Sequence, residues 1–523
     1  MRVDAARQGA GYGRRAPAYA LPCALLLICS AGFVMRLSYV DPEIHLGGDT
    51  VKYLRQAMEL AIYGSLPTDV FIYNTGWSMF LSVLFSFLNP ADLVGHMLVQ
   101  KLAGVAMSTL TIAPIYVISR RYFSGWASLA APAMFAAQPA IIFNSGLGLT
   151  EAPFILLVTS AIACFLSDRK RIVFLAFPIA ALASIVRGEA IIMLALLYVL
   201  YAVKHRSHRI SYEIPLLVLV AALILAPVSA YRIDTWGTDG MFVRVWMLAN
   251  EQLDDVQGSV SSSPVRGSID APSTSTVFVL GQLLVLPLML FVPYGLYRIL
   301  RVDPYLAALL GMMLVITVNI MSFGGYIPRY VLWMIPVMCV LSAFGIKRLA
   351  ELHRRENLAL LAVMALVILA SAATLEEVVD SDSVVEGYGI IASITEEIGE
   401  DAWYLIETSH LHTFVELGSD GLPVSSTGLA GTSSYHQQCP YPDSDCSDTP
   451  GLPAMTADRL RIKYWSHLIV DDYEPRNSYL LHDAFMNEDK YPYLTKVYDS
   501  RDDGFSYHVK VFEVDFEALE RYP

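Results

Sequence analysis

Three charged side chains in an otherwise apolar chain have the chemistry that a group-transfer site needs. Asp49, Glu151 and Arg329 each stand where an apolar stretch gives way to a polar segment. A carboxylate can accept a proton from an attacking hydroxyl group. The planar fork of an arginine matches a pair of phosphate oxygens. These residue types therefore indicate proton transfer beside a phosphate group.

Each of the three residues also has a simpler explanation. Asp49 follows two glycines at the start of an expected helix and can cap its free amide groups. Glu151, after Thr150 and ahead of Pro153, can do the same for the next helix. Arg329 can extend to ordinary lipid headgroups. Both readings stay open from the sequence.

Other charged residues near these positions are further candidates. Asp41 and Glu43 lie close enough to Asp49 to compete for the role of base. Lys101 is a second candidate partner for phosphate, with extension to headgroups as its alternative. Arg187 and Glu189 interrupt an apolar stretch and can simply neutralise each other.

The composition requires that membrane-spanning helices position these residues. Apolar residues make up 55% of the 523 positions, and charged residues only 16% against about 25% in soluble domains. The mean hydropathy is +0.48. Runs of about 20 apolar residues can cross the hydrocarbon layer as helices. The expected fold is a polytopic α-helical membrane protein with eleven spans, at approximately 18–38, 93–118, 124–143, 152–167, 172–187, 189–203, 214–230, 274–296, 305–322, 330–346 and 358–374.

The basic residues predict the orientation of these spans. Eighteen of them fall on the amino terminus and on alternate loops, whereas the intervening loops hold far fewer. The positive-inside rule then places the N-terminus in the cytoplasm, with 18–38 as an uncleaved first span and a secretory signal peptide as the alternative. An odd number of spans puts the C-terminal part outside. We expect a multi-pass protein of the plasma membrane, with the three candidate residues at its outer face.

The charge divides the chain into two expected domains, 1–374 and 375–523. The second domain holds 29 acidic and 9 basic residues, a formal charge of −20, which argues against nucleic acid as a partner. Short apolar runs predict a small extracytoplasmic α/β domain, with strands at 403–407 and 467–471 and a hairpin of 494–498 with 507–514. Cys439 and Cys446 are expected to form a disulfide there, with two free thiols as the alternative.

The expected outer loop 39–92 is long enough to have a function of its own. Thr50–Tyr63 places Val51, Leu54 and Met58 on one helical face, and a second helix fits Trp77–Leu88. Both are too short or too polar to span, so we expect them on the outer surface of the bilayer, where Trp77 suits the interface.

Taken together, these segments resemble the membrane glycosyltransferases of the GT-C superfamily. The resemblance is to the polyprenyl-phosphate-sugar enzymes related to protein O-mannosyltransferases and lipid A aminoarabinose transferases. It rests, in chain order, on Gly48-Asp49 with Tyr53, on Leu149–Pro153, on Val186–Glu189 and on Pro328–Tyr330. It covers most of residues 18–374.

The resemblance implies a role for each residue. Asp49 would be the first-loop acid that faces the acceptor, Glu151 the second-loop acid, and Arg329 the arginine that holds the lipid phosphate. Family members often have two adjacent acids where this chain has only Asp49, so the division of roles between the acids stays open. Further candidates for binding substrate are Tyr53, Lys101, Arg187 and Tyr330.

The implied activity is transfer of one sugar, mannose or another hexose, from a polyprenyl or dolichyl phosphate to an acceptor. Asp49 would take the proton of the acceptor hydroxyl, Arg329 would stabilise the phosphate leaving group, and the displacement would invert the anomeric centre. The Trp-Trp-Asp motif of oligosaccharyltransferases is absent, which disfavours transfer of a whole oligosaccharide.

Other partners and functions stay open. The acceptor can be a protein, a glycan or a lipid, and the surrounding lipids are the remaining partners. The scheme requires no metal, and no His/Cys/Asp cluster has convincing ligand spacing, although participation of a divalent metal is undecided. The alternative function is a transporter or flippase of lipid-linked sugars, which predicts polar residues at mid-depth rather than at the outer ends of spans. An adhesion or receptor protein would not need eleven spans.

Overall fold

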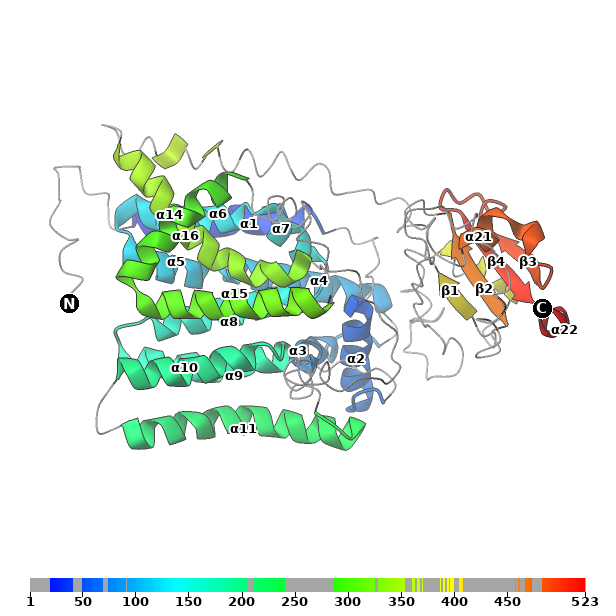
Figure 1. The fold of residues 1–523 in the computed structure, drawn as a ribbon, viewed down its shortest axis with the longest axis horizontal. Helices are drawn as coiled ribbons and strands as arrows, with labels where there is room; N and C mark the ends of the chain where they lie inside the picture. The colour runs from blue at the N-terminus through cyan, green and yellow to red at the C-terminus, as the bar shows by residue number, and fades with distance from the viewer. Residues whose placement is uncertain are drawn as a thin grey trace, which may run out of the picture.

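Helices form the first two-thirds of the protein and a small sheet forms its end (Figure 1). The computed structural model describes residues 19–40, 49–68, 74–90, 92–205, 210–239, 286–324, 328–352, short pieces between 360 and 398, 404–407, 457, 460, 466–472 and 482–522. The helical part contains α1 (Ala20–Leu37), α2 (Asp49–Tyr63), α3 (Thr75–Phe85), α4 (Leu93–Leu110), α5 (Ile112–Tyr122), η2 (Gly125–Leu129), α6 (Ala130–Ala136), α7 (Pro139–Gly146), α8 (Glu151–Phe165), α9 (Lys170–Val186), α10 (Ala190–Lys204), α11 (Ile210–Trp236), α14 (Leu286–Val302), α15 (Pro304–Gly324), η3 (Pro328–Met334) and α16 (Ile335–Glu351).

Helices occupy ten of the eleven predicted spans in whole or in part. The eleventh, 358–374, falls mostly outside the described residues. By length and hydropathy alone, four helical segments among the described residues can cross a membrane. A fifth span results if Gly125–Ala136 and Pro139–Gly146, bent by 51°, count as one. The structure therefore supports a protein with several membrane-type helices, and the number eleven stays a prediction.

Small residues allow the helices of the bundle to approach closely. Ala176, Ala180 and Ala183 recur at helical spacing on α9, and all three are fully buried. Gly295 of α14 lies so close to α16 that a methyl group there would overlap the backbone of Leu341. Such contacts between small residues are typical of helices that pack in lipid.

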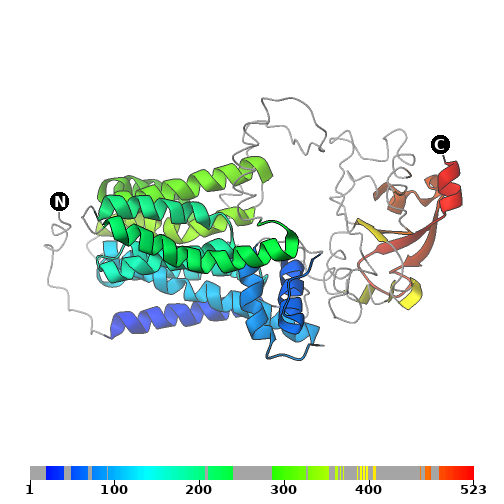
Figure 2. The same ribbon diagram turned by 90° about the horizontal axis from the view of Figure 1, so that it is seen from below.

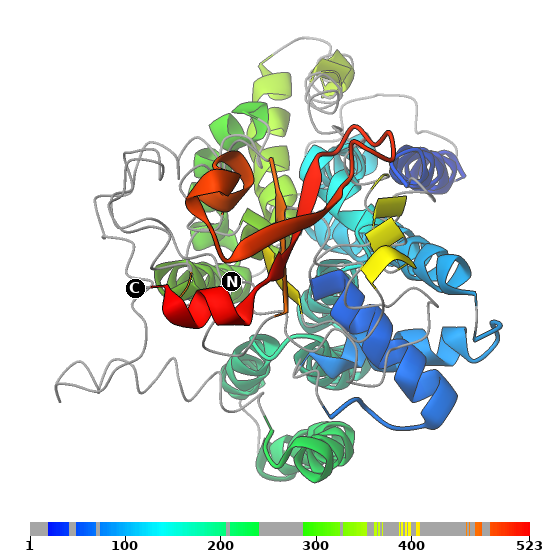
Figure 3. The same ribbon diagram turned by 90° about the vertical axis from the view of Figure 1, so that its right-hand side faces the viewer.

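Helix α2 runs across one end of the helical bundle, as the two side views of the bundle show (Figures 1 and 2). An end-on view shows α2 in front of the ends of the other helices (Figure 3). The predicted apolar face is confirmed, since Val51, Leu54 and Met58 are fully buried. They pack with residues of α3 and α4.

The predicted place of Trp77 at the bilayer interface is wrong. Its side chain is fully buried, and its indole nitrogen donates to the carbonyl oxygen of Gly148 at 2.8 Å. An apolar helical face gives the same pattern whether lipid or protein covers it. Here protein covers the face of α3 that carries Trp77, and the indole fixes this face to the segment before α8.

The predicted strands of the C-terminal part are confirmed. The sheet has the order β1-β2-β4-β3, with β1 parallel to β2 and the other pairs antiparallel. Its strands are β1 (Tyr404–Glu407), β2 (His467–Asp471), β3 (Leu494–Asp499) and β4 (Val509–Val514). Short helices α21 (His482–Met486), η6 (Glu488–Lys490) and α22 (Phe516–Arg521) accompany them.

Both faces of the sheet are covered. Leu468 and Val470 of β2 pack in one apolar cluster, whereas Ile469 between them packs in another with Ile390 and Ile394. This alternation is the period of two expected of a strand. The domain boundary at 374 and the disulfide of Cys439 with Cys446 lie outside the described residues.

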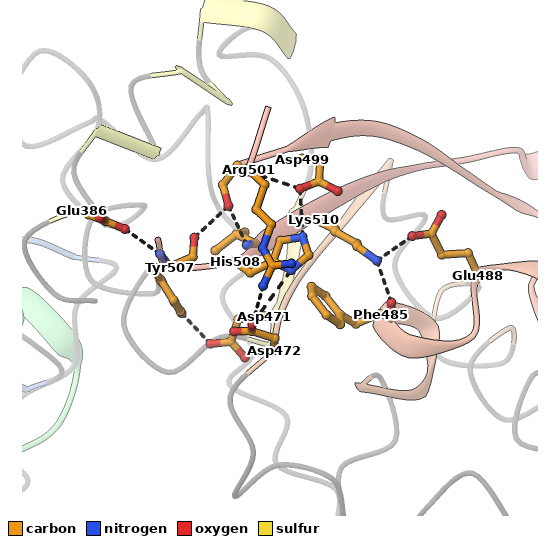
Figure 4. A network of polar contacts seen from close by, with 12 residues as sticks. Glu386, Asp471, Asp472, Phe485, Glu488, Asp499, Arg501, Tyr507, His508 and Lys510 are labelled. Carbon is orange, nitrogen blue, oxygen red and sulfur yellow. Dashed lines mark hydrogen bonds and ion pairs between the residues drawn. The ribbon is translucent and has the colours of Figure 1, made fainter. Parts of the chain in front are cut away.

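A polar network surrounds His508, the residue before β4, at one end of the strands (Figure 4). Its Nε2 atom lies 2.9 Å from Asp499 Oδ1, and its Nδ1 atom lies 3.9 Å from Asp472 Oδ2. Lys510 donates to Glu488 at 2.7 Å on the neighbouring side. These contacts tie the ends of β2, β3 and β4 together.

Candidate functional site

Five charged residues from distant parts of the chain meet at one end of the bundle. Asp49 is the first residue of α2, and Glu151 is the first residue of α8. Arg187 directly follows α9, Glu189 directly precedes α10, and Arg329 lies in η3. Every one of these residues stands at or near the end of an element. The sequence predicts this placement for Asp49, Glu151, Arg187 and Arg329.

The five side chains form a row in which acids and bases alternate. Arg329 Nη2 donates to Asp49 Oδ2 at 2.5 Å, and its Nε atom lies 3.7 Å from Glu151 Oε1. Arg187 Nη1 donates to the same Glu151 oxygen at 3.0 Å, and Arg187 Nη2 donates to Glu189 Oε1 at 3.2 Å. Three carboxylates thus share two guanidinium groups.

Exposure differs between the two ends of the row. The side chains of Glu151, Arg187 and Glu189 are at most 7% exposed, whereas those of Arg329 and Asp49 are 28% and 40% exposed. Buried charges must be paired, because an unpaired charge in the interior is costly. The buried end is therefore fixed by its own pairing, and the Arg329–Asp49 end is the accessible one.

A small, open pocket lies beside the row. Aromatic rings supply part of its wall: the Arg187 guanidinium lies 5.5 Å from the ring centre of Phe154 and 5.0 Å from that of Tyr330. The residues that line the pocket are Glu151, Phe154, Ile155, Arg187, Glu189, Arg329, Tyr330 and Trp333.

Several polar atoms of the row lack a hydrogen bond to the described residues. They include Glu151 Oε2, Arg187 Nε and Arg329 Nε, which are all buried. A buried polar group without a hydrogen bond is costly, so such groups often mark the place of a ligand or water. Two donors and one acceptor are thus available to a bound molecule with both phosphate and hydroxyl groups.

Tyr53 lies next to this site on α2. It is almost completely buried, and its hydroxyl group accepts a hydrogen bond from Asn74 Nδ2 at 3.5 Å. Burial raises the pKa of the Tyr53 hydroxyl, so the group stays protonated at neutral pH. It can therefore donate a hydrogen bond but does not serve as a base.

Lys101 is placed differently from the other candidates. It is buried on α4 and is not among the residues that line the pocket. Its neighbour Gln100 donates to the carbonyl oxygens of Thr50 and Gly148, at 3.1 Å and 2.8 Å. The segment around Lys101 therefore supports the start of α2, and the phosphate contact of Lys101 stays a prediction.

The contacts bear on two of the simpler explanations, helix capping before α8 and local pairing of Arg187 with Glu189. Thr150 makes no side-chain capping hydrogen bond at the start of α8. Arg187 and Glu189 do pair with each other, as that reading expects, but Arg187 also bonds Glu151 from another helix. Asp41 and Glu43 lie outside the described residues.

The sequence does not predict the positions of three charged residues. Glu189 lines the pocket, although the sequence suggested only local pairing with Arg187. Arg232 lies two residues beyond the predicted span 214–230, but α11 continues to Trp236 and the Arg232 side chain is completely buried. Arg36, near the end of α1, is also fully buried, with hydrogen bonds to Ser108 and to the carbonyls of Gly32, Phe135 and Ala136. The only available signal was the charge of each residue at the end of an apolar run.

No group of three or more His, Cys, Asp or Glu side chains in the described part of the chain could hold a metal ion.

Comparison with known proteins gives a family match for the central helices. Residues 93–231 match the sequence model of the family described as dolichyl-phosphate-mannose-protein mannosyltransferase. This range runs from α4 into α11 and includes Glu151, Arg187 and Glu189. No curated protein matches the chain.

Solved structures provide the likeness in fold. ArnT from Cupriavidus metallidurans bound to undecaprenyl phosphate has a TM-score of 0.55 at 13% identity, over 95% of this chain and 98% of ArnT. The apo oligosaccharyltransferase from Archaeoglobus fulgidus has a TM-score of 0.55 at 14% identity, over 87% of this chain and 70% of its own. AglB from the same organism, in complex with an inhibitory peptide and a dolichol-phosphate, gives the same values. ArnT and AglB are GT-C proteins. The resemblance that the motifs predicted is therefore confirmed: the chain has a GT-C-like fold, and its central helices match the mannosyltransferase family of that superfamily.

Proposed function

We propose that the protein transfers a single sugar from a polyprenyl or dolichyl phosphate to an acceptor hydroxyl, at the end of the bundle that carries α2. The observation that supports this most strongly is the junction of Asp49, Arg329, Glu151 and Arg187 beside one pocket. Mannose or another hexose is the sugar we expect, and the outer membrane face is the expected side.

Arg329 is the phosphate-binding residue in this proposal. It is the accessible guanidinium, and its Nε atom has no hydrogen bond to the described residues. Arg187 is held between Glu151 and Glu189, so its charge is already balanced. A lipid phosphate therefore binds at Arg329, where it competes with Asp49 for the guanidinium.

This competition gives Asp49 its function. In the structure described here, Asp49 Oδ2 accepts a hydrogen bond from Arg329. When the donor phosphate takes over that contact, the carboxylate becomes available to the acceptor. Asp49 then removes the proton of the acceptor hydroxyl, whose oxygen forms a bond to the anomeric carbon while the bond from that carbon to the phosphate oxygen breaks. The electron pair goes to the lipid phosphate, which Arg329 stabilises, and the anomeric centre is inverted.

Glu151 orients hydroxyl groups in this scheme. Its Oε1 atom is held by Arg187, and its Oε2 atom has no hydrogen bond to the described residues. A fixed acceptor atom beside the pocket suits a sugar hydroxyl. The aromatic rings of Tyr330 and Trp333 provide a flat apolar wall for the sugar ring.

The test is incorporation of radiolabelled sugar from dolichyl and undecaprenyl phosphate donors into endogenous acceptors. Membranes with wild-type protein, Asp49→Asn or Arg329→Gln are compared at equal expression. Asp168→Asn is the matched control, because Asp168 is an exposed carboxylate that pairs with an arginine elsewhere in the bundle. We expect transfer by the wild type and the control, and its loss in both site variants.

Other outcomes assign the function differently. Full transfer by Asp49→Asn would move the base to Glu151, Asp41 or Glu43. Absence of transfer by the wild type with every donor would reject the proposal and favour the flippase, which vesicles loaded with the lipid-linked sugar would then test.

A further inference from the structure

Arg232 is a fully buried arginine of α11 that joins this helix to α3 and to the end of α9. It lies on α11, and its Nε and Nη2 atoms donate to Thr75 Oγ1 at 3.0 Å and 2.8 Å. Nη2 also donates to the carbonyl oxygen of Ile185 at 3.2 Å, and Nη1 donates to Asp239 at 3.3 Å. Asp239 in turn accepts a hydrogen bond from Ser229. The guanidinium is thus bonded to α3, to α9 and to the residues after α11.

The contact with Ile185 bears directly on Arg187. The last carbonyl groups of a helix have no partner within the helix, and a positive charge near them is favourable. At the end of α9, Arg232 supplies a hydrogen bond to the Ile185 carbonyl group and a positive charge near the helix end. Two residues later, the backbone of Arg187 is extended (φ −148°, ψ 123°) as it leaves the helix. The Ile185 carbonyl therefore fixes the point from which the Arg187 side chain reaches Glu151.

The contact with Thr75 bears on the other side of the site. Thr75 is the first residue of α3, and the preceding Asn74 donates to the hydroxyl group of Tyr53. At Gly76, a methyl group would lie 2.8 Å from Ile185 Cγ2 and 2.9 Å from the backbone nitrogen of Val186. The start of α3 thus lies directly on the end of α9, and Arg232 holds the two together.

We propose that Arg232 is a positioning residue for the transfer reaction, holding the end of α9 and the start of α3 so that Arg187 faces the pocket and Asn74 keeps its hydrogen bond to Tyr53. The inference rests on the function proposed above. Arg232 itself does not line the pocket, so it acts through its partners. A lysine cannot replace it, because a single ammonium group does not reproduce the fork that reaches Thr75, Ile185 and Asp239 together.

The test measures kcat and donor KM of the full chain in detergent for Arg232→Lys, Arg232→Gln, Thr75→Val and Thr75→Ser. Displacement of a reacting group by about 1 Å can reduce a rate by about 100-fold. We expect both arginine variants to lower kcat by about 10- to 100-fold, with donor KM and the thermal shift caused by undecaprenyl phosphate nearly unchanged. Thr75→Val should lower kcat less than the arginine variants do. Thr75→Ser should have nearly wild-type kcat, because serine keeps the hydroxyl group.

Arg121→Gln is the matched control for loss of a bridging arginine. Arg121 bonds Asp303 and the carbonyl oxygen of Leu166, away from the pocket. Equal loss of kcat in this control would overturn the inference, because the effect would then follow from general loosening. Wild-type kcat in both Arg232→Lys and Thr75→Val would overturn it too, and would leave the proposed function intact. A wild-type protein that transfers no sugar would reject the proposed function, and the inference with it.

Discussion

Arg329 serves two carboxylates with one guanidinium group. It donates to Asp49, and its Nε atom lies near Glu151. These contacts use different nitrogen atoms of one planar fork. The charge alone is therefore not what the site requires; the separate donors matter as well.

We predict that Arg329→Lys, which keeps the charge, lowers kcat/KM for the lipid-phosphate donor by about 100-fold, and that Arg329→Gln lowers it further. The expected size is that of removing one donor from a site that stabilises developing negative charge. Steady-state transfer at varied donor concentration measures the effect. A lysine variant with wild-type kcat/KM would show that phosphate is bound elsewhere, for which Lys101 is the remaining predicted partner.

The sequence was sufficient to select most of these residues but not their partners. Asp49, Glu151, Arg187 and Arg329 each interrupt an apolar pattern at the end of an element, which a sequence displays. Asp49 and Arg329 are separated by 280 positions, and only the folded bundle brings them together. Glu189 was paired correctly with its neighbour, yet its place in the pocket depends on where α9 and α10 meet.

At the scale of helices, close packing makes some glycines irreplaceable. Gly295 of α14 lies against the Leu341 backbone of α16, and Gly345 of α16 lies against Phe291. Backbone cannot move aside as a flexible side chain can. The crossing of α14 and α16 therefore depends on glycine at position 295.

We predict that Gly295→Ala destabilises the helical part of the protein by about 1–3 kcal/mol, the usual cost of overpacking. Gly311→Ala in α15 is the matched control, because a methyl group there meets no atom within 4 Å. The control should be neutral or slightly stabilising, since alanine favours helix more than glycine. Unfolding in a denaturing detergent would compare the two, and equal stability of both variants would contradict the packing argument.

The sequence predicted the helices well but not what covers them. Patterns of apolar residues located α2 and its buried face, because helical periodicity is local. The same pattern predicts Trp77 at the bilayer interface, whereas protein covers it. The predicted span 214–230 ends earlier than α11, because a charge such as that of Arg232 usually marks the end of an apolar span and its bonding partners cannot be read from the sequence.

At the scale of the whole molecule, the C-terminal sheet depends on its own polar network rather than on lipid. Asp499 accepts hydrogen bonds from the Arg501 backbone amide at 3.2 Å, from Lys496 at 3.2 Å and from His508 at 2.9 Å if that nitrogen is protonated. Burial opposes ionisation, but these bonds outweigh it, and the pKa of the Asp499 carboxyl lies below its ordinary value.

We predict that Asp499→Asn destabilises the sheet by about 1–3 kcal/mol at pH 7, from the loss of charge-assisted hydrogen bonds. A carboxyl group whose pKa is lower in the folded state stabilises the protein above its unfolded pKa of about 3.9. That stabilisation is lost as the pH falls through the folded pKa, so the two proteins should converge near pH 2. Hydrogen exchange of the β3 and β4 amides in the full chain measures the difference.

Asp502→Asn is the control for this prediction, because Asp502 is exposed in the adjoining turn. It should change stability by less than about 0.5 kcal/mol. If Asp499→Asn destabilises the sheet equally at low pH, the negative charge of Asp499 is not the source of its stabilising effect.

The buried Arg36 has a consequence for the order in which the protein is built on the ribosome. Its partners Ser108 and Ala136 lie 72 and 100 residues further along the chain. At about 5–20 residues per second, roughly 4–20 s pass between synthesis of Arg36 and synthesis of these partners. During that interval the guanidinium, one residue from the end of α1, has the Gly32 carbonyl of its own helix as a partner, and its remaining donors are solvated by water and lipid headgroups. The buried guanidinium of α1 therefore completes its set of hydrogen bonds only after α6 has been synthesised.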